Sequence, residues 1–174
     1  GSLGIGWVDA DDVTREVVMP GEPALAAISE HFGNDVLHAD GTLNRAALRS
    51  IVFDNPAERK WLESVTHPRV RERILVHLER LQRQSPYVLL VSPLLFESGQ
   101  DKLVDRTVVV DVPVELQLSR TRARDDVSEA QVHAILAAQL PREERLTKAN
   151  DVIDNSGDHA SMMQQVTQLD QHYR

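Results

Sequence analysis

The chain has 174 residues, a formal net charge of -8 and no cysteine. This length suits one ordinary domain that buries a hydrophobic core without disulfides. The lack of cysteine excludes disulfides, thiolate metal sites and thiol redox chemistry, and fits the reducing cytoplasm. The acidic balance argues against general binding of nucleic acid, and no apolar run approaches the roughly 18 residues of a membrane helix. We therefore expect a soluble cytoplasmic protein with no nucleic-acid or membrane partner.

Four short aliphatic stretches predict strands, at residues 5–8, 87–91, 107–112 and 151–153. Both of their faces are apolar, which is typical of buried parallel strands. The segments between them have helical spacing, so the pattern predicts an α/β fold with a doubly wound parallel sheet in one domain over residues 1–174. The expected helices span residues 24–32, 44–53, 57–83, 114–124, 128–140 and 161–173.

The segment 57–83 is long for one helix and contains Pro68. Proline clashes with the preceding turn and disfavours the helical conformation of the residue before it. We therefore expect a break near His67. Together with the helix at 44–53, this segment forms a mainly helical insertion, at about residues 40–83, between the first and second strands.

Asp9 and Asp11 lie at and just past the carboxyl end of the first predicted strand. Ligands bind at this edge of open α/β sheets. A carboxylate there can accept a proton from a sugar hydroxyl or help to hold magnesium, as phosphoryl transfer requires. Aspartate is also a common helix cap, here for a helix beginning at Asp12 or Val13. The residues alone leave both roles open.

Arg142 and Arg145 are three residues apart and share one face if the segment is helical. Arginine forks bind phosphate oxygens in pairs and neutralise charge on a transferring phosphoryl group. The alternative is a solvated helix whose arginines pair with Glu143 and Glu144. Without further context, that alternative is favoured.

Two other features are weak evidence by themselves. His67 is a lone histidine, and Glu97 ends an apolar segment, 93–97, that follows the second strand and is most simply core. The sequence has no zinc-type histidine spacing, no Gly-x-Ser-x-Gly elbow and no aromatic RNA-binding signature. We therefore predict no metal site formed by these residues.

Seven short motifs, taken together and in order, resemble those of the dephospho-coenzyme A kinase family over nearly the whole chain. Any one of them is weak evidence, but seven in the family's order are specific. They are Asp-Ala-Asp at 9–11, Asp-Gly-x-Leu-x-Arg at 40–45 with Leu48, His-Pro at 67–68, Pro-Leu-Leu-Phe-Glu at 93–97, Arg-Asp at 124–125, Gln-x-x-Arg-x-x-Arg at 139–145 and Asp-Asn-x-Gly at 154–157.

The resemblance implies a P-loop NTPase-like parallel sheet flanked by helices, with the helical insertion binding the acceptor and a lid at about residues 125–148. It implies an ATP-dependent kinase that phosphorylates the ribose 3′-hydroxyl of dephospho-coenzyme A, with Mg²⁺, in the last step of coenzyme A biosynthesis. The alternatives are another small-molecule kinase of this fold and a catalytically incompetent ligand-binding fragment.

The resemblance also assigns residues to roles. Asp9 would act as base or orient the 3′-hydroxyl, and Arg142 and Arg145 would close over the ATP phosphates. We expect Asp9, Glu97 and both arginines to face one cleft. The acceptor side would include Asp11, His67, Arg71, Leu94, Phe96 and Glu97. The ATP side would include Arg142, with Asn155 and Gly157 near the adenine.

Family members begin with a strand, a Gly-x-x-x-x-Gly-Lys-[Ser/Thr] loop and a helix, and the sequence contains no such motif. A segment of this kind amounts to roughly 25 to 30 residues. Either the sequence starts after it or the segment is deleted, and a deletion would abolish catalysis. We expect the first of these.

Overall fold

The computed structural model describes residues 1–125, 132 and 136–174. The chain consists of two compact units, Gly1–Ser92 and Pro93–Arg174. Most of the helix expected at 128–140, and with it part of the expected lid, lies outside the described residues. The expectation of one domain over the whole chain stays a prediction.

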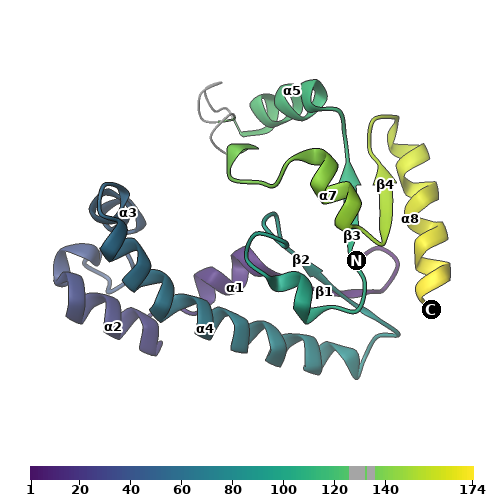
Figure 1. Ribbon diagram of the computed structural model, residues 1–174. Helices are drawn as coiled ribbons and strands as arrows, with labels where there is room; N and C mark the ends of the chain where they lie inside the picture. Colours follow the sequence, from purple (N-terminus) through teal and green to yellow (C-terminus); the bar gives the residue numbers. More distant parts are fainter. Residues whose placement is uncertain (126–131, 133–135) are drawn as a thin grey trace. The chain divides into compact units, whose positions relative to one another are not determined.

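The first unit is built on one long helix, α4 (Figure 1). The strands β1 and β2 pair in parallel, with Gly6 opposite Val88 and Asp9 opposite Val91. Both strands contact α4, as do the three shorter α-helices. The elements are β1 (Gly6–Asp9), α1 (Ala10–Glu16), α2 (Pro23–Phe32), the short 3₁₀ helix η1 (Asn34–Val36), α3 (Arg45–Phe53), α4 (Pro56–Gln82) and β2 (Val88–Val91).

The helix α4 runs unbroken for 27 residues through Pro68, so the expected break near His67 is wrong. Proline deprives a carbonyl of its helical donor. On the same stretch, the side chains of Thr66 and Arg69 donate to carbonyls four residues earlier, at 2.8 and 2.6 Å. The packing of the helix on its neighbours offsets the local cost of the proline, because tertiary contacts supply most of the stability of helices in proteins.

The core of the first unit lies along one face of α4. Val70, Ile74 and Leu78 are buried there at a spacing of four residues, which places them on one side of a helix. In β1, Gly6 lies so close to α4 that a Cβ atom placed on it would be 3.3 Å from Leu81 Cδ2. A glycine at this position therefore lets the strand and the helix approach closely.

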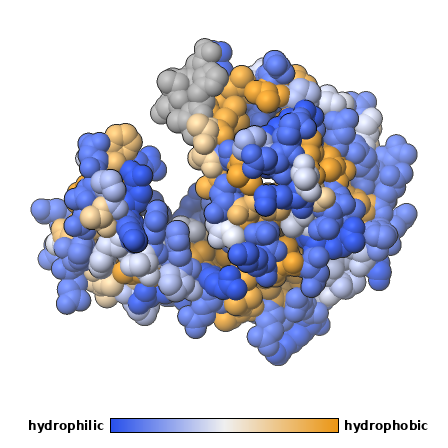
Figure 2. Space-filling view, viewed as in Figure 1, coloured by the Kyte–Doolittle hydropathy of each residue, from blue (hydrophilic) through white to orange (hydrophobic). Residues whose placement is uncertain are grey.

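The outer surface over α2 and α3 is mainly hydrophilic (Figure 2). Helix α3 starts as expected, because Asn44 caps it by accepting a hydrogen bond from the Ala47 N–H at 3.1 Å. Its Leu48 is buried, whereas Phe53 at its end is 69% exposed. Helix α3 is therefore amphipathic, with Leu48 on its packed side.

The second unit contains another parallel pair of strands. In it, Val108 lies opposite Asp151 and Asp111 opposite Asp154. Helix α8 packs on β4, and α7 packs on β3. The elements in the described part of this unit are the 3₁₀ helix η2 (Gln100–Leu103), β3 (Val108–Asp111), α5 (Val114–Asp125), α7 (Arg142–Lys148), β4 (Asp151–Asp154) and α8 (His159–Tyr173).

The four strands of the described residues pair as β1–β2 and β3–β4, so the predicted α/β class with parallel strands is confirmed, and the membership of all four in one sheet stays a prediction. Both pairs are parallel, as the aliphatic strands predicted. Strands of such similar composition do not indicate which of them pair with one another. The sequence therefore predicted where the strands lie and that they are parallel, but not which of them pair.

Candidate active site

Asp9 is both the last residue of β1 and the N-cap of α1. Its Oδ1 atom accepts hydrogen bonds from the Asp11 N–H at 2.8 Å and the Asp12 N–H at 3.4 Å. The capping role is therefore confirmed, although the helix begins at Ala10 and not at residue 12 or 13. Capping uses one carboxylate oxygen and fixes the direction of the other. A catalytic role remains compatible with this geometry.

Helix α1 lies against α4, the helix that carries the predicted acceptor residues of this unit. His67 and Arg71 are exposed and four residues apart, so they lie on the same side of α4. Asp11 is exposed in the first turn of α1. The first unit thus holds four of the predicted site residues, three of them on two helices that touch and Asp9 at the start of one of these helices.

In the second unit, Arg142 binds Asp111, which ends β3. Its Nε lies 2.8 Å from Oδ1 and its Nη2 lies 2.6 Å from Oδ2, a bidentate pair. The hydrogen bonds from Arg142 hold the pKa of Asp111 below its ordinary value. Glu143 is farther away, at 3.7 Å from Nη1. The main partner of Arg142 is therefore a strand-end carboxylate, and not a glutamate of its own helix.

Arg145 contacts another residue of the same motif. Its Nη1 donates to Gln139 Oε1 at 2.9 Å, and Gln117 Nε2 lies 3.4 Å from that same oxygen. The Nε of Arg145 is buried and has no hydrogen-bond partner among the residues that the structure describes. Among the described residues, Arg145 thus binds Gln139 and not Glu143 or Glu144, the partners that the arginine spacing by itself favoured.

The apolar segment 93–97 lies beside the same part of the second unit. Glu97 Oε1 accepts a hydrogen bond from the Leu140 N–H, and Lys148 Nζ lies 5.9 Å from the centre of the Phe96 ring. Leu94 is 37% exposed, so the expectation that the middle of this segment is core is wrong for that residue. The structure brings this motif together with the lid motif.

The loop after β4 is tied to the end of β3. The Asn155 N–H donates to the Asp111 carbonyl at 2.8 Å, and its own carbonyl accepts from Arg120 Nη1 at 2.6 Å. Gly157 is exposed in the same loop. Asn155 thus lies next to the carboxylate that binds Arg142, at one edge of the β3–β4 sheet.

Two residues that bind the lid arginines, Asp111 and Gln139, were not among the predicted site residues. Asp111 ends a strand, as Asp9 does, and this position was the signal that could have identified it. Gln139 was recognised only as part of a motif. Asp9 lies in the first unit and Glu97, Arg142 and Arg145 in the second, so their convergence on one cleft stays a prediction.

No group of three or more His, Asp or Glu residues in the described ranges could hold a metal ion. Among the helices of these ranges, none is long and apolar enough to cross a membrane.

Solved structures share this fold. The crystal structure of TT1252 from Thermus thermophilus matches with a TM-score of 0.79 and 31% identity, over 98% of this chain and 86% of that one. Dephospho-CoA kinase from Campylobacter jejuni matches with a TM-score of 0.73 and 29% identity over the same shares. This α/β arrangement with parallel strands is the fold of a P-loop kinase.

Sequence comparison narrows this class. The family model for dephospho-CoA kinase (CoaE) matches residues 1–161. The dephospho-CoA kinase of Idiomarina loihiensis is 53% identical over 98% of this chain and 84% of its own length. Those of Vibrio parahaemolyticus and Escherichia coli K12 are 50% and 48% identical, each over 82% of its own length and over 97% and 98% of this chain. The chain belongs to the dephospho-CoA kinase family.

Proposed function

We propose that this enzyme transfers the γ-phosphoryl group of ATP to the ribose 3′-hydroxyl of dephospho-coenzyme A. The observation that carries the proposal is the family match over residues 1–161, with relatives of this name at 48–53% identity. The same match disfavours a kinase with another acceptor. The substrates are small molecules, and we place the enzyme in the cytoplasm, where ATP is available.

Asp9 is the residue that we assign to the hydroxyl proton. The 3′-oxygen attacks the γ-phosphorus, the bond from that phosphorus to the ADP oxygen breaks, and Asp9 orients or accepts the proton that the hydroxyl releases. Its Oδ1 is held by the start of α1, so the carboxylate has a fixed direction. Asp11, His67 and Arg71 would line the acceptor side on the same two helices.

Arg142 and Arg145 are the residues that we assign to the phosphates of ATP. A planar guanidinium that binds the two oxygens of Asp111 can bind two phosphate oxygens in the same way. For Arg145, the buried Nε without a partner in the described residues is a donor that phosphate could satisfy.

The remaining predicted residues would complete the two substrate sites. We place Asn155 and Gly157 near the adenine, since their loop is hydrogen-bonded at the edge where Asp111 holds Arg142. Leu94, Phe96 and Glu97 would contribute to the acceptor side.

Magnesium is the ion that ATP-dependent transfer implies. Proteins bind Mg²⁺ mostly through one or two carboxylates together with phosphate oxygens of the substrate, and Asp9 would be the carboxylate that helps to hold it here.

The test is an acceptor panel with the complete enzyme. ADP release is measured with dephospho-coenzyme A, with nucleoside monophosphates and with no acceptor, which serves as the control for ATP hydrolysis. We expect dephospho-coenzyme A to give by far the highest kcat/KM and a product phosphorylated at the 3′-position. Equal or faster turnover of a nucleoside monophosphate would contradict the proposal, as would ATP binding in calorimetry without ADP release.

A further inference from the structure

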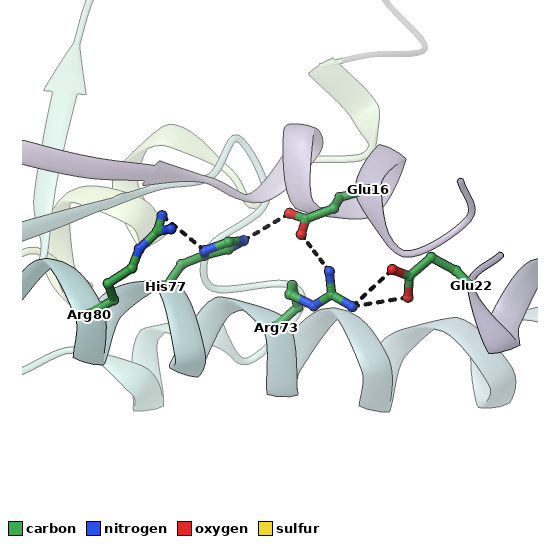
Figure 3. Close-up of polar contacts among 5 residues, drawn as sticks. All are labelled: Glu16, Glu22, Arg73, His77 and Arg80. Atoms are coloured by element: carbon green, nitrogen blue, oxygen red, sulfur yellow. Dashed lines mark hydrogen bonds and ion pairs between the residues drawn. The ribbon is translucent and has the colours of Figure 1, made fainter. Parts of the chain in front are cut away.

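A charged network joins α1, the start of α2 and the middle of α4 (Figure 3). Arg73 of α4 donates through Nη1 to Glu16, and its Nη2 lies 2.9 and 3.2 Å from the two carboxylate oxygens of Glu22. One turn farther along α4, His77 Nε2 lies 2.8 Å from the other Glu16 oxygen, and Arg80 approaches His77 at 3.4 Å. Arg73 thus bridges two carboxylates that belong to two other elements.

The network differs from the ordinary surface ion pairs of this unit. The side chains of Arg73 and Glu16 are 31% and 38% exposed, whereas those of the pair Arg83–Glu79, at the C-terminal end of α4, are 75% and 70% exposed. Exposed pairs within one helix contribute little. A partly buried bridge between elements constrains how those elements pack, because breaking it leaves charges without partners.

The helix that Arg73 holds is too short to be stable by itself. Helix α1 has seven residues, and isolated helices of fewer than about 12 residues are marginal in water. Its position therefore depends on tertiary contacts, which are the buried Ala10 and Val13 on one side and Glu16 at its last turn. Asp9 caps the first turn, so the contacts that place the helix also place this carboxylate.

The charge state of the bridge suits this role at neutral pH. Burial acts to raise the pKa of Glu16, but the hydrogen bonds from His77 and Arg73 outweigh it and lower the pKa below the ordinary value. Bonds to Glu16 and Glu22 raise the pKa of Arg73. Glu16 is therefore a carboxylate and Arg73 a cation wherever the enzyme works near neutrality.

We propose that Arg73 is a positioning residue for phosphoryl transfer. By holding Glu16 and Glu22 on α4, it sets the position of α1, and with it that of Asp9, on the helix that also carries His67 and Arg71. This inference rests on the proposed function, since it concerns the alignment of the base with the acceptor. It predicts that loss of Arg73 disturbs the acceptor side more than the ATP side.

The test compares Arg73→Gln with the parent in the complete enzyme. We expect kcat/KM for dephospho-coenzyme A to fall about 10- to 100-fold, since small misplacements of reacting groups have effects of this size. The KM for ATP should stay within about twofold, well under one decade. Arg73→Lys should recover only part of the loss, because an ammonium group does not bridge two carboxylates as a fork does. Arg83→Gln, which breaks an exposed pair on the same helix, is the matched control and should behave like the parent.

Glu16→Gln adds a test of coupling. If Arg73 acts through Glu16, the double variant should lose no more activity than the more damaging of the two single variants. Independent residues would instead give losses that multiply. Multiplying losses would overturn the inference. A lower Tm of Arg73→Gln with kcat/KM for dephospho-coenzyme A within twofold of the parent would also overturn it, because the role would then be structural only.

Turnover by the parent enzyme and hydrogen exchange in α1 distinguish a failure of the proposed function from a failure of this inference. No turnover of dephospho-coenzyme A by the parent overturns the proposed function. Amide hydrogen exchange in α1 does not depend on turnover, and it should become faster in Arg73→Gln but not in Arg83→Gln. Unchanged exchange in α1 would overturn the positioning role whatever the substrate.

Discussion

Asp9 and Asp111 occupy equivalent places in the two units but have different partners. Each is the last residue of the first strand in a parallel pair. Asp111 is held in a bidentate pair by Arg142, and each of its carboxylate oxygens accepts a hydrogen bond from that guanidinium. Asp9 accepts only backbone N–H groups, through one oxygen, among the contacts that the described residues make.

The difference shows that a place at the carboxyl edge of a sheet does not by itself give an aspartate its role. A carboxylate neutralised by arginine has a lowered pKa and is a poor acceptor of protons. A carboxylate oriented by a helix start, with one oxygen remaining, can still accept a hydrogen bond from a substrate hydroxyl. On this comparison Asp9 is the candidate base, and Asp111 is the anchor of a phosphate-binding arginine.

Alanine at Arg142 or Arg145 gives the largest expected effect. Each change removes a cation that would stabilise the transferring phosphoryl group, and one arginine in related chemistry accounts for about 10³- to 10⁵-fold in kcat. Single-turnover rates with saturating substrates measure the loss, and lysine at either position should rescue poorly. If Arg142→Ala keeps a rate within about threefold of the parent, under one decade, Arg142 serves only as the partner of Asp111.

Asp9→Asn tests the other side of the comparison. Asparagine keeps an oxygen that can cap α1 but cannot accept the proton, so the single-turnover rate should fall about 10²- to 10⁴-fold while ATP affinity and Tm stay near those of the parent. Asp111→Asn is the matched control at the other strand end and should lose much less activity. A rate for Asp9→Asn within about threefold of the parent would leave Asp9 as a helix cap, with Asp11 and Glu97 the next candidates.

Asp111→Asn has the smallest expected effect, which appears in the pH dependence of stability. The folded-state pKa of Asp111 lies below the ordinary 3.8, so its pair with Arg142 contributes stability that is complete above that value and is lost as the pH falls through the lower, folded value. The parent should therefore have a higher Tm than Asp111→Asn at neutral pH, and the difference should shrink below about pH 4. An equal difference in Tm between parent and variant at neutral pH and below about pH 4 would contradict the assigned role of this pair.

Local patterns predicted local structure well. Aliphatic runs gave all four strands to within a residue or two, and Asn44 marked the start of α3. The prediction of a break at Pro68 was wrong because the packing of α4 on its neighbours, which a local rule does not contain, carries the helix through the proline. The pair between Arg142 and Asp111 joins residues 31 positions apart, so no local spacing indicated it. The pairing of β1 with β2 and of β3 with β4 is likewise not indicated by composition.

The place of α4 in the chain determines when the first unit can fold during its synthesis. β1, α1, α2 and α3 all contact α4, yet each of them precedes it. A nascent chain that has left the ribosome only as far as residue 55 therefore lacks the surface on which these elements bury their apolar side chains. Domains generally fold as units during translation. The first unit should thus remain open until residue 82 has emerged, and its sheet closes only when β2 arrives at residue 91.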